Sequence, residues 1–245
     1  MALLEIRDLK KSYTGPDGGR ATVLDLPELV LEAEEQVALR GVSGSGKTTL
    51  LHLIAGVLRP DSGSILLDGE AITDLPMYKR ARYGIGYLPQ ESSVFRRLSV
   101  EDNILAILEM MPLSQQERSE RTELLLKELD LTHLRSSKAY ALSGGERRRL
   151  EITRALVTQP RYMLLDEPFA GVDPIAVDDL QSIVAALRDR GLGILITDHN
   201  VRETLQITDR AYLLYDGKIL KSGDAGELIA DPEARRLYLG EDFRL

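Results

Sequence analysis

The chain has 245 residues, 43% of them hydrophobic and 29% charged, which is typical of a water-soluble globular protein with a sizeable core. The net charge of −8 argues against a general nucleic-acid-binding protein, and the absence of cysteine excludes disulfides and thiolate metal sites. The longest apolar run, 50–58, is far shorter than the ~20 residues of a membrane helix, and the apolar start at 2–4 is too short for a signal peptide. We therefore expect a cytoplasmic protein with no nucleic-acid partner, whose membrane contact, if any, goes through another protein.

The first seventy residues have the pattern of antiparallel strands mixed with one strand–loop–helix unit. Extended segments are expected over residues 3–9, 22–31, 36–40 and 64–69. Between the first two, residues 12–20 are rich in glycine around Pro16, which indicates a hairpin or a loop.

The loop after the strand at 36–40 fits the phosphate-binding pattern G-x-x-x-x-G-K-[ST]. Its glycines let successive backbone N–H groups point into one concavity, and a helix beginning near Gly46 adds its positive end. Lys47 can reach the β- and γ-phosphates of a nucleotide, and the Thr48 hydroxyl can ligate Mg²⁺. The residues expected to hold phosphate are Gly41, Ser43, Gly44, Ser45, Gly46, Lys47, Thr48 and Thr49.

The middle of the chain has the pattern of a helical insertion in an α/β core. A buried strand is expected at 84–88, followed by Gln90, and helices are expected from Ser99 to about Leu134. Helix starts are predicted by capping pairs, in which two side chains satisfy each other's free backbone N–H groups. The pairs are Ser99 with Asp102, Ser114 with Glu117, and Ser143 with Glu146.

The last third of the chain alternates strands and helices, which predicts a largely parallel sheet. The expected elements are strands at 162–166 and 193–197, a helix at 175–190, a hairpin around Asp216–Gly217, and helices beginning near Asp224 and Pro232.

Two acidic residues, Asp166 and Glu167, follow the apolar strand at 162–166. An aspartate at this position can hold Mg²⁺, and the adjacent glutamate can orient or deprotonate an attacking water. Because a phosphate loop lies upstream, this pair indicates nucleotide hydrolysis rather than an ordinary acidic strand end.

Taken in order, these motifs resemble those of ABC-transporter ATPases over nearly the whole chain. The matching segments are Gly41–Thr48, Gln90, Leu142–Glu146, Leu164–Glu167, Val172–Asp173 and His199. The resemblance implies an α/β fold, namely a P-loop (RecA-like) ABC nucleotide-binding domain with an antiparallel β-subdomain and a helical subdomain. It implies one domain over 1–245: a nucleotide core at 1–90 and 159–222, a helical subdomain at 91–158, and C-terminal helices and a tail at 223–245.

The same resemblance implies an enzyme that hydrolyses Mg-ATP to ADP and phosphate. Glu167 would polarise the attacking water, and His199 would sense the γ-phosphate. The implied catalytic residues are Glu167, His199, Lys47 and Gln90, and the implied Mg²⁺ ligands are Thr48, Gln90 and Asp166.

The resemblance also implies binding residues outside the phosphate loop. Tyr13 would stack on adenine. The signature motif Ser143, Gly144 and Gly145 would close over the nucleotide of a second subunit, so the ATP-bound state would be a homodimer. Glu146 departs from the glutamine usual in the family, and we expect no loss of function from it because glutamate suits a capping box.

From about residue 71 onward the sequence is similar to lipopolysaccharide-export ATPases. The similar segments are 84–91, 94–100, 142–150, 166–174, 195–205 and 238–245. This implies transmembrane permease partners, bound through a groove near Phe95, Arg96 and Arg97, and a peripheral location on the cytoplasmic face of the inner membrane. A branched-chain amino acid importer ATPase and a lipoprotein-release ATPase are the alternatives.

Residues 1 to about 66 resemble ATPases of the lipoprotein-release and macrolide-export group instead. We therefore hypothesise an engineered hybrid joined between about Gly63 and Ala71, with weak or no transport, and the alternative is a divergent natural member of the family.

We expect structural rather than functional roles for the arginine and histidine residues outside these motifs. Arg147, Arg148 and Arg149 are expected to form a solvated helix face rather than an anion site. His52 and His133 have no motif around them, so core packing or surface exposure is expected.

Overall fold

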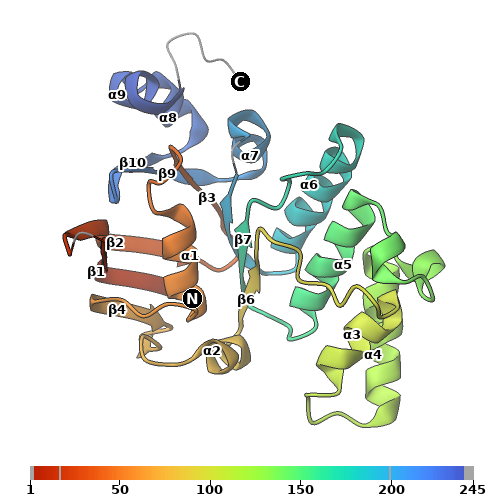
Figure 1. Ribbon diagram of the computed structural model, residues 1–245. Coiled ribbons are helices and arrows are strands. Elements are labelled where there is room, and N and C mark those ends of the chain that lie inside the picture. The colour runs from red at the N-terminus through yellow and green to blue at the C-terminus, as the bar shows by residue number, and fades with distance from the viewer. Residues whose placement is uncertain (1–2, 17, 199, 240–245) are drawn as a thin grey trace.

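The computed structural model describes residues 3–16, 18–198 and 200–239; the side chains of residues 175, 201–203 and 239 lie outside this description. Two sheets organise the chain (Figure 1). The smaller sheet has the strand order β2-β1-β4-β5. Its members are β1 (Leu3–Thr14), β2 (Arg20–Glu32), β4 (Ser62–Leu67) and β5 (Glu70–Ala71), paired antiparallel.

The larger sheet has the strand order β10-β9-β3-β8-β7-β6. It comprises β3 (Gln36–Gly41), β6 (Ile85–Leu88), β7 (Tyr162–Asp166), β8 (Gly193–Thr197), β9 (Arg210–Tyr215) and β10 (Lys218–Gly223). All neighbouring pairs from β9 to β6 are parallel, and β10 pairs antiparallel with β9. The predicted parallel sheet is therefore confirmed, together with the hairpin at Asp216–Gly217.

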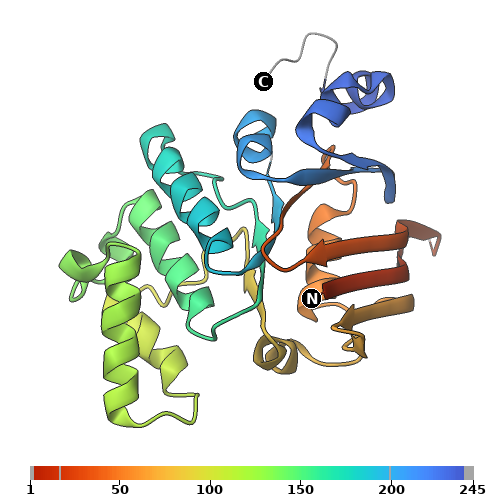
Figure 2. The ribbon, with the colours of Figure 1, turned by 180° about the vertical axis from the view of Figure 1, so that it is seen from behind.

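The helices cover the larger sheet on both faces (Figures 1 and 2). They are α1 (Lys47–Ala55), α2 (Met77–Tyr83), α3 (Val100–Leu108), α4 (Gln115–Glu128), α5 (Gly144–Leu156), α6 (Pro174–Arg188), α7 (Val201–Ile207), α8 (Ala225–Ala230) and α9 (Pro232–Ala234). Short helical turns occur at Thr132–Leu134, Ala139–Ala141 and Arg235–Leu239. No helix among the described residues is long and apolar enough to cross a membrane.

Two hydrophobic cores lie on opposite faces of the larger sheet, because successive strand residues point to opposite sides. On β3, Val37 and Leu39 pack with α1 and the antiparallel sheet, whereas Ala38 packs with the cluster that includes α3 to α6. Burial on both faces explains why β3, β7 and β8 are mostly apolar and are buried along their whole length. The cluster with α3 to α6 is continuous from these helices to the sheet, so the subdomain limits at 91–158 stay a prediction.

Local signals predicted the helix starts correctly. Ser99, Ser114, Ser143 and Asp224 each form a reciprocal capping box with the acidic residue three positions later. One prediction of extent was wrong, and one helix was missed. β1 continues to Thr14 and shortens the expected loop at 12–20, because a register shift between Lys11 and Ser12 lets the strand keep pairing with β2. The helix α2 was missed, because it lacks an apolar stripe and, of its residues, only Arg80 is buried.

Arg80 fixes α2 against the end of α1. Its side chain is 1% exposed, and Nη1 donates to the carbonyl oxygens of Leu53 and Ile54 at 2.6 and 2.8 Å. Nε and Nη2 donate to the carbonyl oxygens of Leu75 and Thr73 at 2.8 and 2.7 Å. Carbonyls in the last turn of a helix lack intrahelical partners and carry the negative end of the helix dipole, so a guanidinium stabilises the end of α1.

We predict that Arg80→Ala lowers the free energy of unfolding by about 3 kcal/mol or more, because it leaves several carbonyls without donors. Urea unfolding followed by circular dichroism measures the change. Arg82→Ala, at an exposed position on the same helix, is the control and should stay within about 0.5 kcal/mol of wild type. Equal stability of the two variants would contradict the role of Arg80.

Candidate nucleotide site

The loop between β3 and α1 requires glycine at its last position. Gly46 has φ 102° and precedes the first residue of α1. A Cβ atom built there would lie 2.7 Å from Leu24 Cδ2 and 2.9 Å from the Val23 carbonyl oxygen. Both the left-handed backbone and this close approach to β2 exclude a side chain. The backbone therefore enters α1 with its first N–H groups free for an anion.

Lys47 lies over this loop. The side chain is 7% exposed, and Nζ donates to the carbonyl oxygens of Gly41 and Val42 at 2.8 and 3.0 Å. Burial, and then the positive charge of Arg40, lower the pKa of Lys47, while Glu167 and Asp166 act in the opposite direction. The ammonium group is thus held by weak carbonyl partners in a place that favours an added negative charge.

A pocket of about 450 Å³ opens above the loop. Its lining residues are Val23, Ser43, Gly44, Gly46, Lys47, Thr48, Thr49, Gln90 and Glu167. The structure thus brings most of the predicted phosphate loop together with Gln90 and Glu167. Val23 was missed, since an apolar residue on an expected strand gives no signal of a pocket.

Glu167 and Gln90 form a direct pair at the edge of the pocket. Gln90 Nε2 donates to Glu167 Oε2 at 2.7 Å, and Glu167 is only 8% exposed. Glu167 has φ 46°, a left-handed conformation that costs energy for a residue with a side chain. Its N–H donates to the carbonyl oxygen and Oγ1 of Thr197 at 2.9 and 3.1 Å, which holds the strained turn in place.

Asp166 connects β7 to the start of α1. Its Oδ1 accepts hydrogen bonds from Thr197 Oγ1 at 2.7 Å and from Thr48 Oγ1 at 3.4 Å. Its Oδ2 is buried and has no hydrogen-bond partner of good geometry among the described residues. The phenol of Tyr87 lies nearby, and burial together with the charge of Asp166 raises the pKa of Tyr87. Thr197 was missed as a site residue; its only signal was its place at the end of an apolar strand.

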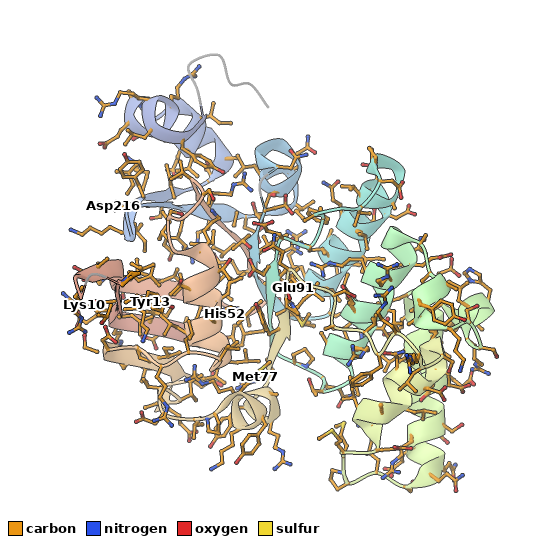
Figure 3. All side chains as sticks on the ribbon, in the orientation of Figure 1. Lys10, Tyr13, His52, Met77, Glu91 and Asp216 are labelled. Atoms are coloured by element: carbon orange, nitrogen blue, oxygen red, sulfur yellow. The ribbon has the colours of Figure 1, made fainter. Side chains whose placement is uncertain are left out.

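Other predicted residues lie outside this pocket. Tyr13 is on the antiparallel sheet (Figure 3) and is 42% exposed. Lys11 Nζ lies 5.6 Å from its ring centre. The signature residues begin α5: Ser143 caps it, and Gly144 lines a separate small cavity of about 110 Å³ beside Gln90. His199 lies outside the described residues.

Ser45 of the phosphate loop is buried, and Gly145 of the signature lies close to α6. Ser45 is 3% exposed, and its Oγ has no hydrogen-bond partner among the described residues. A Cβ atom on Gly145 would lie 2.7 Å from the Ala176 Cβ, so this glycine permits close packing of α5 on α6.

The expectation of a solvated arginine face on α5 was wrong for Arg148, which is 6% exposed. The reason is that Arg148 faces the loops after β6 and β7 rather than solvent. His52 (labelled in Figure 3) is partly buried, and its Nε2 lies 3.0 Å from Tyr87 Oη. His133 is exposed near Asp130.

Known proteins match this chain over nearly its full length. The family model described as "ABC transporter" matches residues 24–170. The chain is 54% identical to the lipopolysaccharide export system ATP-binding protein LptB of Acidithiobacillus ferridurans, covering 99% of each. It is 50% identical to LptB of Escherichia coli K12, covering 100% of each. A solved ABC-transporter ATP-binding cassette in its ADP conformation has a TM-score of 0.84 at 30% identity, covering 98% of this chain and 100% of that one.

These comparisons also bear on the hypothesis of a hybrid joined between Gly63 and Ala71. The two LptB proteins align across that junction from one end of the chain to the other, so a hybrid origin is not supported. The fold, the pocket and the full-length similarity agree, and the chain belongs to the ABC transporter family as an ATP-binding subunit that hydrolyses ATP.

Proposed function

We propose that this chain is the ATPase that powers lipopolysaccharide export from the inner membrane, working as a peripheral subunit on its cytoplasmic face. The observation that carries the enzymatic part is the Gln90–Glu167 pair, which lines the same pocket as Lys47 and Thr48. The choice of cargo is supported by relatives named for lipopolysaccharide export at 50 to 54% identity over the whole chain.

ATP would bind with its phosphates against the loop from Gly41 to Thr49. The free N–H groups at the start of α1 suit phosphate oxygens, and the Lys47 ammonium would exchange its carbonyl partners for the β- and γ-phosphates. Tyr13 is proposed to stack on adenine. Its ring is accessible for this role, and it lies on the same antiparallel sheet as Val23 of the pocket.

Mg²⁺ fits the oxygen groups beside the phosphate loop. Thr48, Asp166 and Gln90 would hold it, directly or through water, and the buried Asp166 Oδ2 is an acceptor that such an ion or its water would satisfy. When bound, Mg²⁺ offsets negative charge on the phosphates.

Glu167 is the proposed group that orients and deprotonates the attacking water. Its strained backbone and its contact with Gln90 hold the carboxylate at the pocket, which it lines together with Lys47 and Thr48. His199 is proposed to sense the γ-phosphate from the segment after β8.

A second copy of the chain would complete the site. Ser143, Gly144 and Gly145 form the N-terminal end of α5, where free N–H groups favour an anion. They do not line the pocket that holds Lys47. We propose a homodimer with ATP bound, in which the signature of each copy closes over the nucleotide of the other.

The permease would bind where the chain leaves β6. Phe95 is 49% exposed beside the exposed Arg96 and Arg97. The loop is held from beneath by Asn103, which accepts from Phe95 N at 2.8 Å and donates to Phe95 O at 3.1 Å. The Arg154 guanidinium lies 4.6 Å from the Phe95 ring centre. An aromatic ring fixed at an exposed position is a suitable anchor for a partner helix.

We predict that Glu167→Gln binds ATP with near wild-type affinity but hydrolyses it roughly 10²- to 10⁴-fold more slowly, because the amide cannot take a proton from water. Phosphate release measures turnover, and size-exclusion chromatography with ATP should show an accumulated dimer. Glu109→Gln, at an exposed position after α3, is the matched control and should keep full activity. A Glu167→Gln protein that turns over like wild type would rule out the proposed role.

We predict that the chain co-purifies with the transmembrane pair of a lipopolysaccharide exporter when expressed with it. Phe95→Ala should lower the recovered complex at least fivefold, because an interface aromatic typically contributes ~2 kcal/mol or more, and should leave the turnover of the isolated chain unchanged. Met110→Ala, which removes an 81% exposed side chain after α3, is the control. Stronger recovery with a branched-chain amino acid or lipoprotein-release permease would instead support those cargoes.

A further inference from the structure

A buried ion pair on α5 lies between the signature motif and the proposed catalytic residues. Arg148 and Glu151 are one turn apart and are 6% and 4% exposed. Arg148 Nη1 lies 2.8 Å from Glu151 Oε2. Removing two charges from water is costly, and a buried ion pair needs further hydrogen bonds to offset the loss of hydration. The other hydrogen bonds of Arg148 and Glu151 therefore show which segments of the chain the pair holds in place.

Arg148 directs its remaining donors to the carbonyl oxygens of two loops. Nη1 also donates to Pro89 O at 3.0 Å, directly before Gln90. Nη2 donates to Asp166 O at 3.2 Å and to Glu167 O at 3.1 Å, and Nε donates to Pro168 O at 2.8 Å. Together with the bond to Glu151, these contacts engage all five N–H groups of the Arg148 guanidinium. One side chain thus holds the backbone on both sides of the Gln90–Glu167 contact.

Glu151 extends the same network along the segment after Gln90. Its Oε1 accepts from Ser92 Oγ at 2.6 Å and from Ser93 N at 3.2 Å. Its Oε2 faces Arg148. The carboxylate therefore keeps the guanidinium in place and binds the segment that leads to Phe95.

The position of the pair on α5 connects these loops to the signature. Ser143 caps the helix, and Arg148 follows it by five residues, or about 7.5 Å along the axis. Because Arg148 lies in the second turn of α5, a shift of the N-terminal end of the helix would also displace Arg148 and the carbonyls that it binds.

We propose that Arg148 and Glu151 are positioning residues that set the geometry of Gln90 and Glu167 according to the position of the signature helix. This rests on the proposed roles of Gln90 and Glu167 in hydrolysis. Contact of the signature with a nucleotide would then be transmitted to the carboxylate that activates water.

The conservative substitution Arg148→Lys tests this proposal. Lysine keeps the charge but not the planar fork, so it cannot bind the carbonyls of both loops together. We expect kcat to fall roughly 10- to 100-fold, the size of effect that a misplacement of about 1 Å produces. ATP affinity should stay within about twofold, because the phosphate loop is untouched. Arg147→Lys, on the same helix, should keep wild-type kcat.

An additional measurement separates positioning from mere loss of stability. Hydrogen–deuterium exchange of peptides covering 89–93 and 166–169 should rise in Arg148→Lys and in Glu151→Gln at temperatures where both are fully folded. Glu151→Gln should lower kcat about 3- to 10-fold, and the double variant should be less impaired than the product of the two effects, since the residues act as one unit.

The outcomes distinguish failure of this proposal from failure of the proposed function. If Glu167→Gln is inactive while Arg148→Lys keeps wild-type kcat, the positioning role is wrong and the function stands. If Glu167→Gln keeps wild-type turnover, the proposed catalytic role of Glu167 is wrong, and the positioning role that rests on it is wrong as well. If Arg148→Lys does not fold, Glu151→Gln decides: wild-type kcat per folded molecule would overturn the positioning role.

Discussion

The site depends on the parallel pairing of β3, β8, β7 and β6, because parallel strands end at the same edge of a sheet. Asp166 pairs in register with Thr197, and Leu88 pairs with Leu165 one step away. The phosphate loop, the acidic pair and Gln90 come from distant parts of the chain. Each begins where its strand stops, so the sheet register brings them to one pocket.

Buried arginines donate hydrogen bonds to carbonyl groups that have no partner in a sheet or helix. Loops at the edge of a sheet carry carbonyl groups without ladder partners, and such groups are costly when buried. Arg148 satisfies carbonyls after β6 and β7, and Arg80 satisfies those at the end of α1. A guanidinium suits this task because its five donors spread over a plane, whereas a lysine would reach fewer of them.

Local signals in the sequence were sufficient for several parts of the fold and site. The glycines and Lys47 identify the phosphate loop, because few residue types allow that backbone and charge. Serine and acid spacing predicted the start of α5, since the capping bonds span only three residues. These features are determined within one short segment, so no knowledge of tertiary contacts was needed.

Features set by distant contacts could not be predicted in this way. Arg148 and its neighbours look like a solvated triplet in sequence, and only the packing of α5 against two loops shows that one of them is buried. Thr197 is one of many strand residues until its register opposite Asp166 is known. The extent of β1 depends on a register shift against β2 that no local pattern encodes.

The strained backbone of Glu167 is held both by the sheet and by α5. A left-handed glutamate persists only where its surroundings hold it, and here Thr197 binds its N–H while Arg148 binds its carbonyl. The first contact comes from the neighbouring strand and is fixed by the sheet. The second comes from α5, which begins at the signature, five residues before Arg148. In the proposed dimer, the contact from α5 is therefore the one through which the second subunit would act on the carboxylate, because α5 also carries the signature.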